Sequence, residues 1–319
     1  MKHITIGFSI HRPEMVPVTA RIMEQHDVIF LEEPPEVNFE DMLNSSLEVE
    51  DYLMPLDLEY PEFSRSMCYL ERELYASGKQ FIQVEPFVEA LLSVHEFIAQ
   101  GNRPEDLKRD TLPYFAYLAE RNATGALLKY YKTVLTGSFK ATLEAIRQFA
   151  RADAARFRLR DSLRAQEIAR QASGHTAVFV EAGTIHYQLW QLLWRKLSGT
   201  FQVKPVFLDR VALPAPNQQQ HLYSPGDQLT LAYIFHPHLA DDTWESRMAA
   251  QSIVYSKIIQ KQESRQGVGS FLHLTDERKC IRMVRVLTIN DCGHLYPLIR
   301  HEGTASARRI VEAYLKTKH

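Results

Sequence analysis

The amino-acid sequence predicts an α/β protein with a mainly parallel central sheet flanked by helices, a large helical insertion and a smaller C-terminal α+β region. Three observations predict this class: several apolar runs have the length of strands, helical periodicity fills the segments between them, and the runs lack a polar face. Strands that alternate with helices imply parallel crossover connections. Fully apolar strands imply a sheet that is covered on both faces.

Four segments have the length and composition of buried strands. A large helical region lies between the third and the fourth of these segments. A fifth apolar run, Val203–Leu208, resumes strand character later in the chain. The four expected strands are His3–Ser9, Asp27–Leu31, Lys79–Val84 and Thr176–Val180.

Helical patterns separate these strands. Helices are expected over Val16–Gln25, Tyr60–Ser77 and Tyr187–Leu197, and the helical insertion covers about residues 88–171. Within the insertion, one long helix is expected over Phe139–Ala172, because apolar residues recur there at helical spacing. These residues are Leu143, Ile146, Ala150, Ala154, Phe157, Ala165 and Ile168.

The character of the chain changes after about residue 210. Pro214, Pro216 and a run of three glutamines mark a loop and a boundary, so residues 1–210 are expected to form the core and 211–319 a C-terminal α+β extension. The elements expected in this extension are a strand over Leu229–Phe235, a helix over Asp241–Gln262, a strand-rich stretch over Val268–Ile289 and a final helix over Ala305–Lys316.

Bulk composition limits the classes of function. The chain has 319 residues, 45% of them hydrophobic, and a formal net charge of −2, so no electrostatic footprint for nucleic acid or an anionic membrane is expected. No segment reaches the ~18 uncharged apolar residues of a membrane span. The three cysteines are far apart in the sequence, which argues against a disulfide framework or a thiolate zinc site. A cytoplasmic protein is expected, with a small molecule or a peptide as its substrate and an oligomeric state that the sequence leaves open.

Charged residues and histidines follow the expected strands. His11 comes after the first strand, Glu32 and Glu33 after the second, Glu85 after the third, and His186 a few residues after the fourth. In open parallel sheets, ligands bind outside the carboxyl ends of the strands. Two imidazoles with several carboxylates at this edge suit either a divalent metal or metal-free acid/base chemistry.

Asp161 and Arg160 add a second argument. Asp161 lies on the stripe of the long helix that otherwise faces the core, where a carboxylate is costly unless it is paired. We expect it to be buried and either paired with Arg158 or Arg164, one turn away, or directed toward the sheet edge. Arg160 is adjacent and is a candidate for reaching that edge.

Ordinary explanations exist for each of these residues taken alone. A single glutamate at a strand end is usually solvated or lies near a helix N-terminus, a Glu-Pro pair can simply end a strand, and a lone histidine is more often hydrogen-bonded than a ligand. An ion pair within the helix would by itself account for Asp161. The conjunction of such residues after four strands is what favours a site.

Taken together, these segments resemble the EreA/ChaN-like and TraB/PrgY/GumN (Tiki) superfamily over about residues 1–210. The matching motifs are Gly7-Phe8-Ser9-Ile10-His11, Val28-Ile29-Phe30-Leu31-Glu32-Glu33, Arg160-Asp161 ahead of Ala165 and Ile168-Ala169, and Val178-Phe179-Val180-Glu181-Ala182-Gly183-Thr184-Ile185-His186. The first motif has three residues between Gly7 and His11, where the family pattern has two. Residues after 211 have no counterpart in the family pattern.

The resemblance implies a site built from His11, Glu32 or Glu33, Arg160, Asp161 and His186, to which the strand-end pattern adds Glu85. The leading hypothesis is a hydrolase of amide or ester bonds. In a metal-dependent form, His11, Glu33 (or Glu32) and His186 would hold a divalent ion and Glu85 would be the general base. In a metal-free form, His11 or His186 would activate water.

Two other classes of function stay open at this point. One is a protein that binds haem or a small ligand without turnover, as ChaN-like members bind haem, with His186 and Tyr187 supplying axial ligation. The other is an interaction protein that uses its C-terminal region and whose site has decayed.

Overall fold

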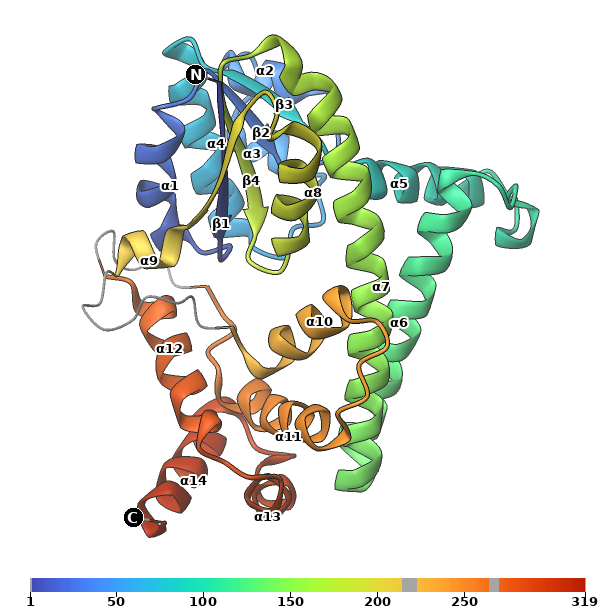
Figure 1. The fold of residues 1–319 in the computed structure, drawn as a ribbon, viewed down its shortest axis with the longest axis vertical. Helices are drawn as coiled ribbons and strands as arrows, with labels where there is room; N and C mark the ends of the chain where they lie inside the picture. Colours follow the sequence, from blue (N-terminus) through green and yellow to red (C-terminus); the bar gives the residue numbers. More distant parts are fainter. Residues whose placement is uncertain (1, 214–222, 264–269, 319) are drawn as a thin grey trace. The chain divides into compact units, whose positions relative to one another are not determined.

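The computed structural model describes residues 2–213, 223–263 and 270–318, and Figure 1 shows their arrangement. The fold is α/β, with one five-stranded, all-parallel sheet and many flanking helices. The strands lie in the order β3-β2-β4-β1-β5, so β4 occupies the centre of the sheet. Their bounds are β1 His3–Ser9, β2 Val28–Leu31, β3 Gln80–Gln83, β4 Ala177–Gly183 and β5 Gln202–Phe207.

All five strands expected within residues 1–210 are present, and the largest difference concerns β4. Pairing with β1 continues as far as Ser9 opposite Gly183, so Glu181, Ala182 and Gly183 belong to the strand itself. Gly7 lies in β1 opposite Glu181, and a Cβ atom on Gly7 would come within 2.3 Å of the Phe179 ring. The glycine of the first motif is therefore required by the packing of Phe179 inside the sheet.

The sheet separates two hydrophobic layers. One layer joins Val178 and Val180 to helices α7 (Phe139–Gln171) and α8 (Tyr187–Leu197), and the other joins Phe179 to α1 (Val16–Met23) and α4 (Pro61–Ala76). Because successive side chains of a strand point to opposite faces, alternate residues of β2 and β4 enter alternate layers. Both faces of the sheet are covered, as the apolar strands predict.

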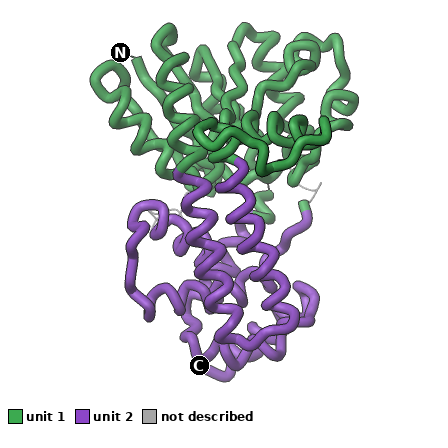
Figure 2. Tube along the Cα trace, turned by 90° about the vertical axis from the view of Figure 1, so that its right-hand side faces the viewer, with its two compact units in different colours: residues 1–116, 159–221, 263–273 green, residues 117–158, 222–262, 274–319 purple. Residues whose placement is uncertain are grey.

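The first compact unit of the chain carries the sheet. It comprises residues 1–116, 159–221 and 263–273, and it is drawn in green in Figure 2. Besides the elements already named, its helical segments include α2 Phe39–Leu43, α3 Val49–Leu53, α5 Pro86–Ala99 and α9 Leu208–Ala212, with short 3-10 turns at Pro13–Met15, Pro104–Asp106 and Ala172–Gly174.

The second compact unit is helical in the part that the structure describes. It comprises residues 117–158, 222–262 and 274–319, so the middle half of the helical insertion, residues 117–158, belongs with the C-terminal region. Ion pairs link these stretches, since Arg147 on α7 lies 2.6 Å from Asp242 and 3.1 Å from Glu245. Its main helices are α6 Leu112–Thr136, the first part of α7, α10 Pro225–Phe235, α11 Asp242–Ile258, α12 Leu272–Arg285, α13 Ile289–Ile299 and α14 Thr304–Thr317.

The expectation of strands after residue 211 is wrong for the described residues. Leu229–Phe235 is the end of helix α10, which begins at Pro225 after an N-cap at Ser224, and most of the stretch 268–289 is helix α12. Residues 268 and 269 lie outside the described part. Short apolar runs do not distinguish a buried strand from a buried helix, and Leu229, Leu231, Tyr233 and Ile234 are all buried.

Among the described residues, no helix is long and apolar enough to cross a membrane.

Candidate functional site

Glu32 and Glu33 lie at the end of β2 and belong to different faces of the sheet. Val28 and Phe30 pack in the layer of α7 and α8, whereas Ile29 and Leu31 pack in the layer of α1 and α4. Continuing this alternation, Glu32 falls on the α7 side and Glu33 on the α4 side. The contacts of the two carboxylates agree with this placement. Glu32 lies near two arginines of α7, whereas Glu33 accepts a hydrogen bond from Gln83 and lies near Tyr52 and Glu71.

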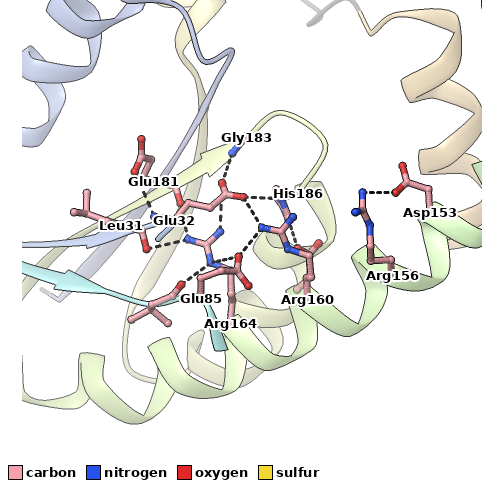
Figure 3. Close-up of polar contacts among 12 residues, drawn as sticks. Leu31, Glu32, Glu85, Asp153, Arg156, Arg160, Arg164, Glu181, Gly183 and His186 are labelled. Carbon is pink, nitrogen blue, oxygen red and sulfur yellow. Dashed lines mark hydrogen bonds and ion pairs between the residues drawn. The ribbon is translucent and has the colours of Figure 1, made fainter. Parts of the chain in front are cut away.

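His186 is held between two carboxylates on the α7 side. Its Nε2 lies 2.7 Å from Glu32 Oε1, and its Nδ1 lies 2.5 Å from Asp161 Oδ1. The second oxygen of Asp161 accepts a hydrogen bond from the Leu189 backbone N–H, in the first turn of α8, at 3.1 Å. Glu32 Oε2 accepts the Gly183 N–H at 2.7 Å, as Figure 3 shows. His186 and Asp161 are 2% and 0% exposed, so this arrangement is fixed inside the protein.

Two arginines of α7 complete this network (Figure 3). Arg160 Nη2 lies 2.8 Å from Glu85 and 3.5 Å from Glu32. Arg164 is fully buried, donates to the carbonyl oxygens of Val84 and Glu181 at 3.0 and 2.9 Å, and lies 3.5 Å from Glu32. A helix places residues four apart on one side, so Arg160 and Arg164 both face the strand ends.

The charges of this network balance if His186 is protonated. The carboxylates are Glu32, Glu85 and Asp161, and the cationic groups are Arg160, Arg164 and His186. Burial by itself lowers the pKa of His186, but the charges of Glu32 and Asp161 outweigh it and raise that pKa to about 9. Burial likewise raises the pKa of Glu32, and His186 and Arg164 outweigh it, which holds that pKa well below its usual range. We infer that His186 is an imidazolium at neutral pH.

His11 lies next to this network in a different state. Its ring stacks on Phe63 of α4, with ring centroids 5.0 Å apart and an interplanar angle of 16°. A Cβ atom placed on Gly183 would lie 3.7 Å from His11 Nε2 and 3.7 Å from His186 Cδ2, so the two imidazoles flank the space beside Gly183. Burial lowers the pKa of His11, with Glu32 acting in the opposite direction. Within the described part of the chain, neither ring nitrogen of His11 has a hydrogen-bond partner.

The α4 side of the same edge holds carboxylates that form no ion pair among the described residues. Glu181 and Glu71 are 7% and 1% exposed, and Glu71 Oε2 has no hydrogen-bond partner among the described residues. Burial, followed by the charges of neighbouring glutamates, raises the pKa of Glu181 to about 8 and that of Glu71 well above its usual range. Burial also raises the pKa of Glu33, whose Oε2 accepts a hydrogen bond from Gln83 at 3.1 Å.

The structure therefore brings together most of the residues that the sequence singles out. His186, Asp161, Glu32, Glu85 and Arg160 form one contact network, and His11 lies beside it. The expectation that Asp161 is buried and reaches the sheet edge is confirmed, but an arginine partner for it is not found among the described contacts. Arg158 donates to the Tyr233 carbonyl oxygen at 2.7 Å and Arg164 turns to Glu32, because His186 already neutralises Asp161.

Other expected site residues lie elsewhere. Glu33 faces the α4 side, away from His186. Tyr187 packs with Phe8 and Phe207, at centroid distances of 5.8 Å from each, rather than in a cleft for haem. Three residues that the sequence reasoning did not assign to the site are Arg164, Glu71 and Glu181. For Arg164 a signal exists, because it lies on the core-facing stripe of α7 between Asp161 and Ile168.

These side chains, as arranged, do not fit a divalent metal ion. Both ring nitrogens of His186 are engaged by carboxylates. Glu32 already lies within 3.5 Å of two guanidinium groups, which would repel a metal cation. Across residues 2–213, 223–263 and 270–318, no group of three His, Cys, Asp or Glu side chains is arranged to hold a metal ion. The same occupied nitrogens leave His186 no position for axial ligation of haem.

Comparison with known proteins gives one distant relative to report. The chain is 24% identical over 272 residues to a protein of Archaeoglobus fulgidus that is described only as an uncharacterized protein, and the match covers 85% of this chain and 89% of that protein. No protein-family model matches the chain, and no solved structure matches it. The similarity extends over most of both chains.

Proposed function

We propose that this protein hydrolyses a carboxylic ester or amide without a resident metal ion, and that His11 is its general base. The observation that carries the proposal is the pairing of two histidines in opposite states. His186 is clamped between Glu32 and Asp161, whereas His11, partly exposed and without a hydrogen-bond partner in the described structure, flanks the same space beside Gly183. A base needs a free ring nitrogen, and of these two histidines it is His11 whose ring nitrogens have no hydrogen-bond partner among the described residues.

In the proposed reaction, His11 takes a proton from water as the water oxygen bonds to the substrate carbonyl carbon, and the carbonyl π electrons move onto its oxygen. Arg160, whose side chain is 17% exposed, stabilises that oxyanion. When the carbonyl re-forms, the bond to the alcohol or amine breaks, and His11 returns the proton to the leaving group. One water is consumed, and one acid and one alcohol or amine are released.

The remaining residues act by positioning. Glu85 and Glu32 hold Arg160 at 2.8 and 3.5 Å, and Arg164 anchors the strand ends from which Glu32 and Glu85 follow. The imidazolium of His186 keeps Glu32 charged and in place. A network that is already balanced and hydrogen-bonded does not need to reorganise when charge develops on the substrate, which favours catalysis.

The test is hydrolysis of p-nitrophenyl acetate, p-nitrophenyl butyrate and peptide p-nitroanilides by the full chain. We expect turnover of at least one class, a loss of about 100-fold or more in His11→Ala, and partial recovery of that variant on addition of imidazole. The matched control is Glu73→Gln, an exposed residue on α4, which should keep the wild-type rate. Absence of turnover by the wild type, or a His11→Ala variant as active as the wild type, would refute the proposal.

A further inference from the structure

A cavity of about 610 Å³ lies within the second compact unit, among helices α6, α7, α10 and α11. Figure 1 shows these four helices. The volume is within the range of about 300–1,000 Å³ that is typical of small-molecule sites. All the lining residues belong to the second unit, so this cavity is separate from the residues that gather around His186.

The wall formed by α6 and α7 is apolar. It includes Tyr130 and Val134 from α6, and Ile146, Phe149 and Ala150 from α7. Ala150 is 3% exposed and Ile146 is 4% exposed, so the wall is continuous with the interior of the unit. The ring of Tyr130 offers an apolar contact for a ligand. An apolar chain would therefore find partners along this wall.

The charged residues that line the cavity differ in whether a partner or a helix N-terminus neutralises their charge. Asp153 is paired with Arg156 at 2.6 Å, and Asp227 lies in the first turn of α10, where it accepts a hydrogen bond from the Ser224 hydroxyl at 2.8 Å. Lys257 and Lys261 form no ion pair among the described residues. Among the described residues, the ammonium of Lys257 donates to the Arg300 carbonyl oxygen, at 3.2 Å.

The two lysines are also close enough to repel each other. Burial is the main cause that lowers the pKa of Lys257, the charge of Lys261 adds to it, and the charge of Glu302 acts in the opposite direction. Two ammonium groups that form no ion pair within the described part of the chain, beside an apolar wall, form a site that is complementary to an anionic group. Carboxylates that are already neutralised by Arg156 or by a helix N-terminus do not cancel this preference.

We propose that this cavity binds an anionic amphiphile, with its apolar chain against the α6 and α7 wall and its carboxylate or phosphate head at Lys257 and Lys261. The proposal does not depend on the hydrolase function, because it involves none of the same residues. The ligand is defined by two features, an unbranched or flat apolar body and a single anionic head. Two sources share that chemistry, namely a free fatty acid and an alkyl phosphate.

The experiment is isothermal titration calorimetry of the full chain with four probes below their micellar concentrations. Dodecanoate and dodecyl phosphate should bind, and their relative affinities distinguish the two sources. Dodecanol and dodecyltrimethylammonium share the chain but lack the anionic head, so they should bind at least about tenfold more weakly. Equal binding of the cationic and anionic probes, or no heat from either anionic probe, would overturn the proposal.

Separate substitutions test the lysine site for the anionic head and the apolar wall for the chain. The double variant Lys257→Ala/Lys261→Ala should lose about tenfold in affinity for dodecanoate while keeping its affinity for dodecanol. The control is Lys132→Ala/Lys140→Ala, which removes the same charge from exposed positions of α6 and α7 that do not line the cavity. In Ala150→Trp the indole should fill the cavity and weaken all probes. If that variant does not fold, Ala150→Leu repeats the test with a smaller side chain. Unchanged dodecanoate binding in the lysine double variant would contradict the assignment of the head site.

Discussion

Glu32 and Glu33 are neighbours in the sequence, yet they lie on opposite sides of the sheet, and their pKa values are shifted in opposite directions. On the α7 side, Glu32 meets His186, Arg160 and Arg164, and its pKa is held well below the usual range. On the α4 side, Glu33 lies with Glu71 and Glu181, and the pKa of each carboxyl is raised. A buried carboxylate is favourable or unfavourable according to the cations around it, and one residue of strand alternation decides which surroundings it has.

The largest expected effect comes from removing the buried cation of the α7 side. Arg164→Met should lower the free energy of unfolding by about 3–5 kcal/mol, because it removes a buried cation beside Glu32 and Glu85 and the side-chain donor to the Val84 and Glu181 carbonyl oxygens. Denaturant titration at pH 7 measures this. Arg170→Met is the matched control on the same helix, since the Arg170 side chain is 70% exposed, and it should change little. Similar losses in the two variants would mean that Arg164 does not hold the network.

A smaller loss is expected for Glu32→Gln, which keeps the shape of the side chain and removes its charge. We expect a loss of about 2–4 kcal/mol at pH 7, because His186, Arg160 and Arg164 then share two carboxylates. The pKa of Glu32 is lowered in the folded state, so its contribution is present above about pH 4.5 and is lost as the pH falls through the folded-state value. The difference between wild type and variant should therefore shrink in strong acid. A difference that grows as the pH falls would contradict this assignment.

On the α4 side, replacing a glutamate by glutamine should stabilise the protein instead of destabilising it. Glu71→Gln should raise the free energy of unfolding by about 1–2 kcal/mol near pH 8, because the wild-type carboxyl is buried without a partner for Oε2. Its pKa is raised in the folded state, so the wild type is penalised only above the unfolded value of about 4.5, and the two proteins should be equally stable near pH 4. Thermal unfolding at both pH values tests this, with Glu73→Gln as the exposed control on α4. A loss of stability in Glu71→Gln at pH 8 would show that Glu71 has a favourable partner when charged.

The sheet could be predicted from the sequence because its strands are long apolar runs that lie far apart in the chain. The pairing of Asp161 with His186 could not be predicted in the same way, since nothing in the sequence relates a residue of α7 to one that follows β4. Which of Glu32 and Glu33 joins His186 could not be decided from the sequence either. The residues of β2 are apolar on both faces of the sheet, so the sequence does not show which face each glutamate continues. In the C-terminal region, apolar runs of seven residues misled the prediction, because helix α10 is buried on several sides.

The most direct test of the whole account is the titration of the two site histidines by nuclear magnetic resonance. The chain has 13 histidines, so the His11 and His186 signals are assigned by their disappearance in His11→Asn and His186→Asn. The account predicts that His186 stays an imidazolium through neutral pH and titrates at about 9, and that His11 titrates below 6.5. A neutral His186 at pH 7, or a His11 that titrates above 6.5, would contradict both the balanced network and the choice of His11 as the base.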